Sequence, residues 1–422
     1  MRALVASAPE PWYRSITRDQ WRVLVAAKLG WMLDAMDFMI YAMAVGRLKT
    51  YFGFDDATAG MLGTVTLATS ALGGLVFGVV ADRLGRTRAL MGTILIFSLA
   101  SLGAATSQSV TQLLMWRALL GIGMGGEWAS GAVLVSETWP PAHRNKAISI
   151  VQSGWAIGYI LAAVMAALIL GSPSLGPDSW RWLFVAGVLP AFLILWVRRN
   201  VPEPAVWSEK RAARVSNPFA VIFGRRLIRR TLLVILLGST LQFAYWGIFF
   251  WLPGFLARPV TQGGAGMGIV GSLGWIIPVQ VGAYFGYLTF GFIADRVGRR
   301  PTFIGFMLGA ATLVPIYALM ARSPLVLLLL GPVLGYVGHG YFSMFGSFVA
   351  ELFPTPVRAT GQGTSYNAGR LAGALAPYVI GVLAQQPRIG LGLAIASTSA
   401  FFLASAVIIF ALPDRSGQPL DA

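Results

Sequence analysis

A few charged side chains stand inside long apolar stretches of this 422-residue chain. Asp34 and Asp37 lie in the first stretch, and Arg117 and Glu127 lie in the fourth. On insertion scales, a charge at the centre of a membrane helix costs at least about 2.5–3.5 kcal/mol, so such residues are usually functional. A buried carboxyl group can carry a proton, and a buried guanidinium can hold a carboxylate through two parallel hydrogen bonds.

The acidic residues are the candidate proton carriers. Asp34 and Asp37 are expected near mid-membrane, and their spacing of three residues places both carboxyl groups on one face of a helix. Two carboxylates that close are not easily both ionised in a low dielectric, so we expect at least one to exchange a proton. The alternative is that one of them pairs permanently with a cation on a neighbouring helix. Glu127 is the second candidate, because the glycines around it allow another helix or a ligand to approach closely.

Two arginines are candidate clamps for an anionic substrate. Arg117 could bind a substrate carboxylate, or could instead neutralise one of the aspartates in a permanent ion pair. Arg370, beside Asn367, could also bind substrate, or could contact only backbone carbonyls or lipid headgroups. His339 could transfer protons, because imidazole titrates near neutral pH, or could be a hydrogen-bonded packing residue.

Neutral polar residues complete the candidate substrate site. They occur in pairs that share one face of a helix, at spacings of three and four residues. Such groups could bind substrate oxygens, or could bond only to neighbouring helices. The pairs are Gln242 with Tyr245, and Gln280 with Tyr284.

The elements that position these residues are membrane-spanning helices. Hydrophobic residues make up 56% of the chain and charged residues only 11%. In a soluble domain, about a quarter of all residues are charged. Apolar runs of about 20 residues, separated by polar or Gly/Pro-rich breaks, predict twelve helices. Their expected ranges are 22–45, 57–81, 89–107, 112–136, 147–171, 180–198, 231–256, 265–293, 302–321, 325–350, 360–385 and 390–412.

The distribution of Lys and Arg predicts the orientation. Loops after even-numbered helices hold 18 of these residues, and loops after odd-numbered helices hold at most six. Because cytoplasmic loops are enriched in Lys and Arg, both termini and the central loop are expected in the cytoplasm. A compact chain without Cys and without a cleavable leader suits a bacterial inner membrane. The expected organisation is an N-terminal tail, a six-helix bundle, a basic linker, a second six-helix bundle and a C-terminal tail, at 1–21, 22–198, 199–230, 231–412 and 413–422.

An internal repeat relates the two bundles. The segment Ala81–Arg86 recurs as Ala294–Arg299 at an offset of 213 residues, and a Glu followed seven residues later by an Arg recurs at an offset of 214. This pattern predicts a duplicated six-helix unit, as in secondary transporters with parallel repeats. The charged residues of the repeat are candidate gates, although basic loops could also serve orientation alone. They are Asp82, Arg86, Glu137, Arg144, Asp295, Arg299, Glu351 and Arg358.

These motifs resemble the signatures of the major facilitator superfamily. The resemblance rests on Gly78–Arg86 with its second copy, and on Arg117–Glu127. Within the superfamily, the chain is similar to metabolite:proton symporters of the sialate/lactate type, with a weaker likeness to aromatic-acid:proton symporters, which usually have Gly and Phe where this chain has Ala35 and Met36. Further segments that carry the likeness are Asp34–Tyr41, Gly123–Trp128, Val135–Pro140, Trp180–Phe184 and Tyr366–Arg370. The resemblance implies a twelve-helix, all-α membrane fold with alternating access, whose cavity is lined by helices 1, 4, 7 and 10.

The expected function is proton-coupled uptake of a small organic anion. Alternatives are symport of an aromatic acid or a neutral sugar, proton-driven efflux, and a non-transporting nutrient sensor. The chain has no Cys and two His, and we find no metal-ligand spacing, catalytic triad or phosphate-binding loop. We therefore do not expect an enzyme, a nucleic-acid partner or an obligate protein partner. We expect the proton gradient to supply the energy without a cofactor, and the protein to be monomeric.

Overall fold

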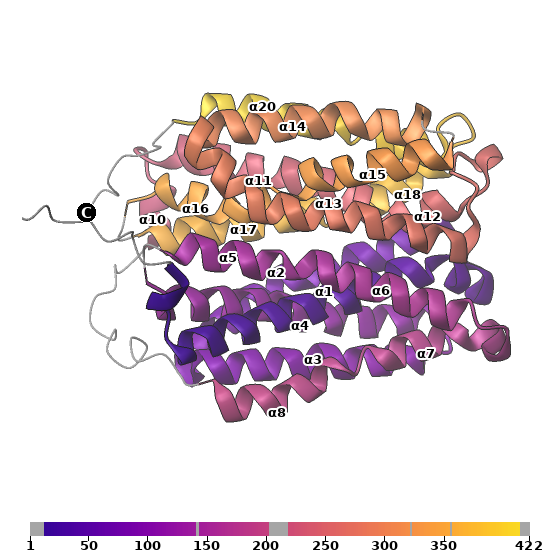
Figure 1. The fold of residues 1–422 in the computed structure, drawn as a ribbon, viewed down its shortest axis with the longest axis horizontal. Helices are drawn as coiled ribbons and strands as arrows, with labels where there is room; N and C mark the ends of the chain where they lie inside the picture. The colour runs from indigo at the N-terminus through magenta and orange to yellow at the C-terminus, as the bar shows by residue number, and fades with distance from the viewer. Residues whose placement is uncertain (1–11, 141–142, 202–217, 321–322, 355–356, 414–422) are drawn as a thin grey trace, which may run out of the picture.

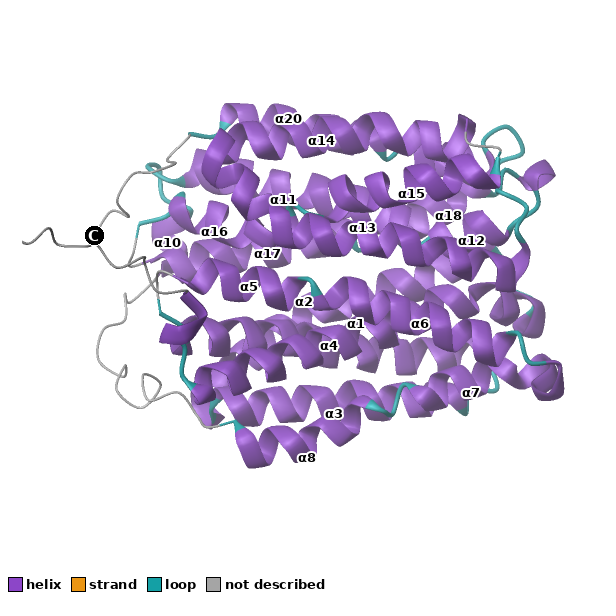
Figure 2. Cartoon of the chain, in the orientation of Figure 1, coloured by secondary structure: helices purple, strands orange, loops and turns teal. Residues whose placement is uncertain are grey.

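The computed structural model describes residues 12–140, 143–201, 218–320, 323–354 and 357–413. Within these ranges the chain is helical with short connections, as Figure 2 shows, and no strand is assigned. Ten helical segments of the described chain are long and apolar enough to cross a membrane. Two further segments, which carry Asp34, Asp37 and Arg370, complete the set of twelve, so the predicted all-α membrane fold is confirmed.

The first bundle follows the short 3-10 helix η1 (Trp12–Ser15). Its first four segments are single helices, and the last two are each broken into two helices. Their bounds are α1 (Arg18–Phe52), α2 (Asp56–Leu84), α3 (Arg86–Ala105), α4 (Val110–Thr138), α5 (Arg144–Gln152) with α6 (Gly154–Leu170), and α7 (Ser179–Ala186) with α8 (Pro190–Asn200), the 3-10 helix η3 (Pro173–Asp178) preceding α7.

The second bundle follows a short helix, α10 (Pro218–Ile222), and most of its segments are interrupted near their middle or one end. Their bounds are α11 (Ile228–Phe249) with α12 (Leu252–Ala257), α13 (Gly268–Val297), α14 (Arg299–Pro315) with the π-helix η5 (Ile316–Met320), α15 (Pro324–His339) with α16 (Phe342–Glu351), α17 (Arg358–Gly373) with α18 (Ala376–Ala384), and α19 (Gly390–Ala396) with α20 (Ser399–Ala411); the 3-10 helix η4 (Val260–Gln262) precedes α13.

Several helices differ from their expected ranges. The first helix is longer than 22–45, because Thr17 and Gln20 form a capping box before it and Gly53, with φ of 69°, ends it. The eighth starts at Gly268 rather than 265, after several glycines with positive φ. The linker predicted at 199–230 contains α10 and the first residues of α11, and residues 202–217 lie outside the described ranges.

The repeated sequence motif makes the same turn in both bundles. Gly85, between α2 and α3, has φ of 110°, and Gly298, between α13 and α14, has φ of 100°. Side-chain-bearing residues rarely adopt this backbone conformation, so glycine is required at both positions. Both turns lie at the end of the molecule where η1 and the end of α20 also lie, on the left in Figure 1. We call this the basic end, and the opposite one the far end.

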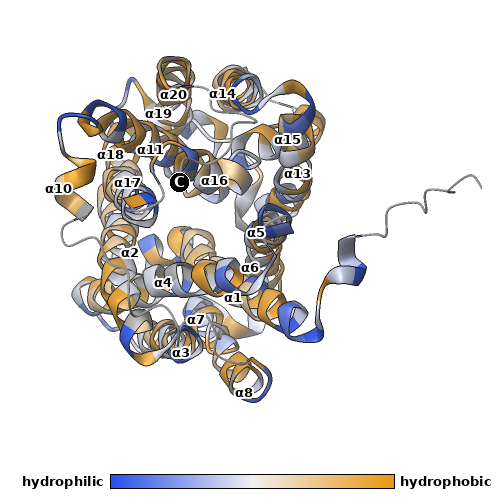
Figure 3. Cartoon of the chain, turned by 90° about the vertical axis from the view of Figure 1, so that its left-hand side faces the viewer, coloured by the Kyte–Doolittle hydropathy of each residue, from blue (hydrophilic) through white to orange (hydrophobic). Residues whose placement is uncertain are grey.

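The two bundles contact each other along two sides. On one side α2 packs against α17 and α18, and on the other side α5 and α6 pack against α13 (Figure 3). The outer surfaces are apolar, as expected for contact with lipid. On α2, for example, Leu72, Leu75, Val76 and Val79 form an exposed apolar face at helical spacing.

Glycine allows α2 and α4 to cross closely within the first bundle. A methyl group on Gly125 would overlap the carbonyl oxygen of Ser70, whereas a methyl group on Gly305 of α14 would meet nothing within 4 Å. We expect Gly125→Ala to lower the free energy of unfolding by about 1–3 kcal/mol, because overpacking forces backbone shifts. Thermal unfolding of the purified protein measures this effect. Gly305→Ala is the matched control, and equal melting temperatures for the two variants would contradict the prediction.

Candidate functional site

The charged residues of the candidate site lie in the middle of the bundles. Asp34 is at the centre of α1, and its carboxyl group is fully buried. Glu127 of α4 is also buried, and its carboxyl group lies against Gly30, where a β-carbon would come within 2.5 Å of Oε1. Glycine at this position therefore lets Glu127 approach α1 one turn before Asp34.

Arg370 connects this acidic pair to the second bundle. It lies on α17, is 2% exposed, and interacts electrostatically with both Asp34 and Glu127. No hydrogen bond joins Arg370 to either acid, and both oxygens of Asp34 and two guanidinium nitrogens, Nε and Nη1, have no partner among the described residues. The guanidinium also lies 5.2 Å from the ring centroid of Tyr366. The guanidinium group of Arg370 thus faces the two carboxyl groups across the bundle interface without a hydrogen bond to either.

Asp37 has a different environment from Asp34. Its Oδ1 accepts a hydrogen bond of 2.5 Å from the hydroxyl group of Ser101 on α3. Gly187, which follows α7, leaves room for this carboxyl group, because a β-carbon there would lie 2.5 Å from the same oxygen. A spacing of three leaves about 60° between two side chains around a helix. The two aspartates still interact electrostatically, but Asp37 points into the first bundle and Asp34 toward the second.

Arg117 is the cation nearest to Asp37. It is fully buried on α4, interacts electrostatically with Asp37, and stacks over the rings of Tyr41 and Phe38 at 4.5 and 5.2 Å. None of its guanidinium nitrogens has a hydrogen-bond partner among the described residues. The structure therefore places Arg117 beside Asp37, whereas Arg370 is the arginine that faces Asp34.

The neutral candidates fall into two groups. Gln242 donates from Nε2 to the carbonyl oxygen of Tyr366 at 3.2 Å, and Asn367 donates to Gly363 at 3.0 Å, so both amides bond to the backbone. Tyr284 is half-buried, and the Lys28 ammonium group lies 5.7 Å from its ring centroid.

The other group consists of Gln280, Tyr245 and His339, whose side chains are at most 3% exposed. Gln280 is fully buried and neither of its amide atoms has a hydrogen-bond partner in the described chain. The hydroxyl group of Tyr245 is likewise buried, and the indole of Trp155 lies beside it. His339 bonds through Nδ1 to the carbonyl oxygen of Gly335 at 3.0 Å, and its ring packs against Tyr245.

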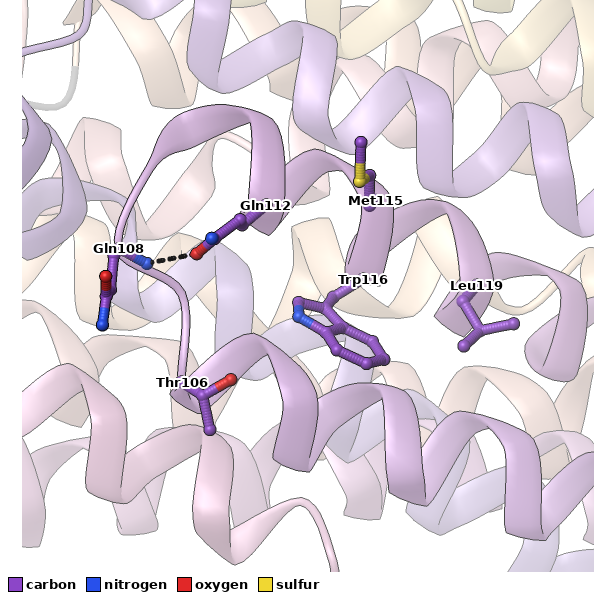
Figure 4. A pocket seen from close by; sticks show the side chains of 6 residues that line it. All are labelled: Thr106, Gln108, Gln112, Met115, Trp116 and Leu119. Carbon is purple, nitrogen blue, oxygen red and sulfur yellow. Dashed lines mark hydrogen bonds between the residues drawn. The ribbon is translucent and has the colours of Figure 1, made fainter.

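A surface pocket of about 630 Å³ lies elsewhere, at the far ends of α3 and α4 (Figure 4). One wall includes Gln112, whose side chain accepts a hydrogen bond from the backbone of Gln108 at 2.8 Å. The remaining lining residues are Thr106, Met115, Trp116 and Leu119, so the pocket contains none of the charged candidates. Within the described residues, no group of three or more His, Asp or Glu could hold a metal ion.

The helical membrane fold agrees with comparisons to known proteins. Residues 29–288 match the Major Facilitator Superfamily. The chain belongs to this superfamily. It is 36% identical over 415 residues to a probable 4-methylmuconolactone transporter of Cupriavidus pinatubonensis, which covers 97% of this chain and 94% of that protein. It is 30% identical over 409 residues to the cis,cis-muconate transport protein of Acinetobacter baylyi, covering 94% and 96%.

Solved structures support the same fold. A D-xylose–proton symporter superposes with a TM-score of 0.76 and 20% identity, covering 95% of this chain and 99% of that one. A bacterial homolog of the lysosomal transporter Spinster, in an inward-facing conformation, gives a TM-score of 0.75 and 18% identity, covering 94% and 97%. The protein is thus a major facilitator transporter and not an enzyme, as predicted.

The charged residues of the repeated loops pair within each bundle of the transporter. Arg86 of α3 lies 3.3 Å from Glu137 of α4, and Arg299 of α14 pairs in the same way with Glu351 of α16. Asp295 is exposed, and the side chain of Asp82 lies outside the described part of the structure.

The two remaining arginines of the repeat, Arg144 and Arg358, each stand at the start of a helix, α5 and α17. Arg358 donates from Nε to the carbonyl oxygen of Phe353 at 3.3 Å. The observed pairs thus join neighbouring helices of one bundle and do not connect the bundles.

At the far end, an ion triad does connect the bundles. Oδ1 of Asp56, at the start of α2, lies 2.5 Å from Nζ of Lys49 and 2.8 Å from Nη2 of Arg258, which follows α12. Nearby, the backbone N–H of Tyr378 donates to Thr64 across the same interface at 3.3 Å. From the sequence, Lys49 and Arg258 count only toward the loop charge, and their proximity to Asp56 arises from the fold.

Neutralising Asp56 should favour opening of the far end. We expect Asp56→Asn to increase the labelling rate of a single Cys at Thr64 by about fivefold, because a partly buried ion pair contributes on the order of 1 kcal/mol. The chain has no Cys of its own, so a water-soluble maleimide reports this position alone. Asp19→Asn removes an exposed ion pair with Arg22 at the basic end and serves as control. An unchanged rate in Asp56→Asn would show that the triad does not hold the far end closed.

Proposed function

We propose that this transporter takes up a small organic anion together with a proton. The observation that carries the proposal is the burial of Arg370, Asp34 and Glu127 in the middle of the bundles, with both oxygens of Asp34 and two nitrogens of Arg370 lacking a hydrogen-bond partner in the described residues. Arginine binds carboxylates through two parallel hydrogen bonds, and Arg370 has Nε and Nη1 without partners. A substrate carboxylate would therefore bind Arg370 between the two bundles.

Proton coupling follows from the charge balance of this site. Two carboxylates and one guanidinium carry a net charge of minus one, and a bound anion alone would add another negative charge beside Asp34 and Glu127. A net buried charge is costly in a membrane protein. If Asp34 or Glu127 takes up a proton as the anion binds, the net charge of the loaded site equals that of the empty site. The carrier can then change between its two states with the same electrostatic cost.

Asp37 and Arg117 form a separate balanced pair in this proposal. Asp37 accepts a hydrogen bond from Ser101, and Arg117 lies between it and the aromatic rings of α1. The pair lies inside one bundle and not at the interface, so Asp34 and Glu127 are the preferred proton carriers. Asp37 and His339 are still predicted proton carriers, but we rank them below Asp34 and Glu127 because neither faces Arg370.

The relatives' names support an organic acid as the substrate. Those proteins are named for 4-methylmuconolactone, cis,cis-muconate and, in Escherichia coli, sialic acid. We extend to this chain only the feature that an arginine clamp explains, a carboxylate group. The proton gradient would supply the energy without a cofactor. A monomer with both termini in the cytoplasm of a bacterial inner membrane completes the proposal, since η1 and the end of α20 lie at the basic end.

Proteoliposomes with an inward proton gradient test the proposal. We expect internal acidification when small carboxylic acids are added, and none with neutral sugars, because only a carboxylate binds Arg370 and draws in a proton. Acidification by sugars alone would favour a neutral-substrate symporter. Acidification when the acid is present only inside would favour proton-driven efflux, because the exported acid is then exchanged for inward protons. Silence across the panel with folded protein would contradict transport coupled to protons.

Changing Arg370 should weaken substrate binding specifically. We expect Arg370→Lys to raise the KM for the transported acid by about tenfold or more, because an ammonium group keeps the charge but loses the two-pronged geometry worth about 1.5–3 kcal/mol. Initial rates of acid uptake at varied concentration measure this change. Arg181→Lys, at the far end of the first bundle, is the control. An unaltered KM would exclude Arg370 as the clamp.

The two aspartates should respond differently to neutralisation. Asp34→Asn should lower proton-driven accumulation while preserving exchange of the acid, because Glu127 is then the one remaining proton carrier at the site and Arg370 stays available. Asp37→Asn should lower stability by about 3–5 kcal/mol, since it leaves Arg117 buried without its counter-charge. Counterflow and thermal unfolding separate the two effects, and Asp37→Asn with Arg117→Gln should recover stability. The same loss of exchange in both single variants, with no loss of stability, would contradict this division.

A further inference from the structure

A second group of buried polar side chains lies in the C-terminal bundle, outside the charged site formed by Arg370, Asp34 and Glu127. It contains Tyr245 of α11, Gln280 of α13, His339 at the end of α15, and Tyr341, which precedes α16. All four are at most 3% exposed. The hydroxyl group of Tyr341, both amide atoms of Gln280 and Nε2 of His339 have no hydrogen-bond partner in the described residues, and the hydroxyl group of Tyr245 has the indole of Trp155 beside it. Buried polar groups are normally paired, so this concentration needs an explanation. We call these four residues the neutral cluster.

Ring contacts place the members of the neutral cluster together. The ring centroid of Tyr245 lies 5.1 Å from that of His339, and Tyr287 lies 5.9 Å from the same histidine. Phe342 links Tyr341 to this group, because its ring centroid lies 4.5 Å from that of Tyr341 and 5.1 Å from that of Tyr245. Gln280 precedes Tyr287 by seven residues, or about two helical turns, and therefore lies on the same face of α13.

The neutral cluster borders the first bundle. Tyr245 packs against Phe249 with ring centroids 5.0 Å apart, and the carbonyl oxygen of Phe249 accepts a hydrogen bond of 2.7 Å from the hydroxyl group of Tyr159 on α6. Next to Tyr245, Trp246 lies with its ring centroid 5.8 Å from that of Trp155, also on α6. The unpartnered groups thus lie beside the interface at which the anion is proposed to bind.

His339 has a defined hydrogen-bonding role in this group. Its Nδ1 bonds to the carbonyl oxygen of Gly335, and a carbonyl oxygen can only accept, so Nδ1 carries the proton. In the neutral ring, Nε2 is then an acceptor. The neutral cluster therefore offers an acceptor at His339, donors and acceptors at Gln280, and hydroxyl groups at Tyr245 and Tyr341. It contains no charged side chain.

One tyrosine separates the neutral cluster from the anion site. Tyr366 of α17 lies under the Arg370 guanidinium at 5.2 Å, and its carbonyl oxygen accepts a hydrogen bond of 3.2 Å from Gln242, three residues before Tyr245 on α11. Tyr245 packs against His339 with ring centroids 5.1 Å apart. A ligand held by its carboxylate at Arg370 could therefore extend past one aromatic ring to reach the neutral cluster.

We propose that Tyr245, Gln280, His339 and Tyr341 form a subsite that binds a second, uncharged oxygen-bearing group of the transported anion. This inference rests on the proposed function, because it takes the carboxylate at Arg370 as the first point of attachment. Suitable second groups are a hydroxyl, a carbonyl or an un-ionised carboxyl, each of which can use the donors and acceptors present. A second ionised carboxylate does not fit, because the subsite offers no cation to balance it.

The subsite predicts discrimination between matched acids that differ by one hydroxyl group. One aromatic pair is 3-(3-hydroxyphenyl)propionate with 3-phenylpropionate, and one aliphatic pair is 6-hydroxyhexanoate with hexanoate. Each compound is tested as a competitor of proton-coupled flux by an acid that drives acidification in proteoliposomes. In at least one pair, we expect the hydroxylated member to compete at about tenfold lower concentration, because a site built to bond a hydroxyl is left unsatisfied by the analogue without it.

Variants then assign the discrimination to the neutral cluster. Tyr245→Phe and Gln280→Leu should each bring the ratio within the responding pair close to one, by weakening the hydroxylated member and leaving the other unchanged. Tyr317→Phe removes a buried, unpartnered phenol of η5 outside the neutral cluster and should keep the ratio. Equal competition within both pairs in the unmodified protein, or an equal loss for both members in the variants, would overturn the subsite. Absence of flux with any acid would instead overturn the proposed function.

Discussion

Arg370 opposite Asp34 and Glu127 is the interaction on which the arrangement of this transporter depends. The three residues come from α17, α1 and α4, and all are nearly inaccessible. A single charge in this position would be expensive in a membrane, and the cost falls only when opposite charges face one another. The two bundles must therefore keep α17 close to α1 and α4. Gly30 permits Glu127 of α4 to approach α1, and Gly74 of α2 permits the approach of Asn367 on α17.

The same constraint connects binding to movement. Arg370 belongs to one bundle and both acids belong to the other, so a change in the relation between the bundles alters their interaction. The loop charges of the basic end pair inside each bundle, as Arg86 does with Glu137. At the far end, Asp56 pairs across the bundles with Arg258. The ion pairs of the basic end thus join helices of one bundle, whereas those of the far end join the two bundles, although the repeat makes the bundles similar in sequence.

Much of the fold could be predicted from the sequence, because local sequence patterns determine the membrane spans and the repeat. Apolar runs give the spans, and the repeated Asp-Arg-x-Gly-Arg loops give the duplication, including the positive φ shared by Gly85 and Gly298. The helix breaks, such as those after Ser153 and around Gly340, were not predicted, since they depend on packing against neighbouring helices.

The residues of the site could be predicted, but not their partners. A charge inside an apolar run is visible in the sequence, which identifies Asp34, Asp37, Glu127 and Arg117. The spacing of the aspartates indicates a shared face, yet Ser101 on α3 draws Asp37 away from the environment of Asp34. That hydrogen bond joins residues 64 positions apart, and helical periodicity carries no information about such distant contacts.

The central claim is that an anion and a proton bind together at Asp34, Glu127 and Arg370. Isothermal titration of the purified protein with a transported acid, at one pH in buffers of different ionisation enthalpy, measures the protons taken up per anion bound. The account predicts uptake of close to one proton in the unmodified protein, and binding without proton uptake when Asp34→Asn is combined with Glu127→Gln. Anion binding to the unmodified protein with no proton uptake would contradict it.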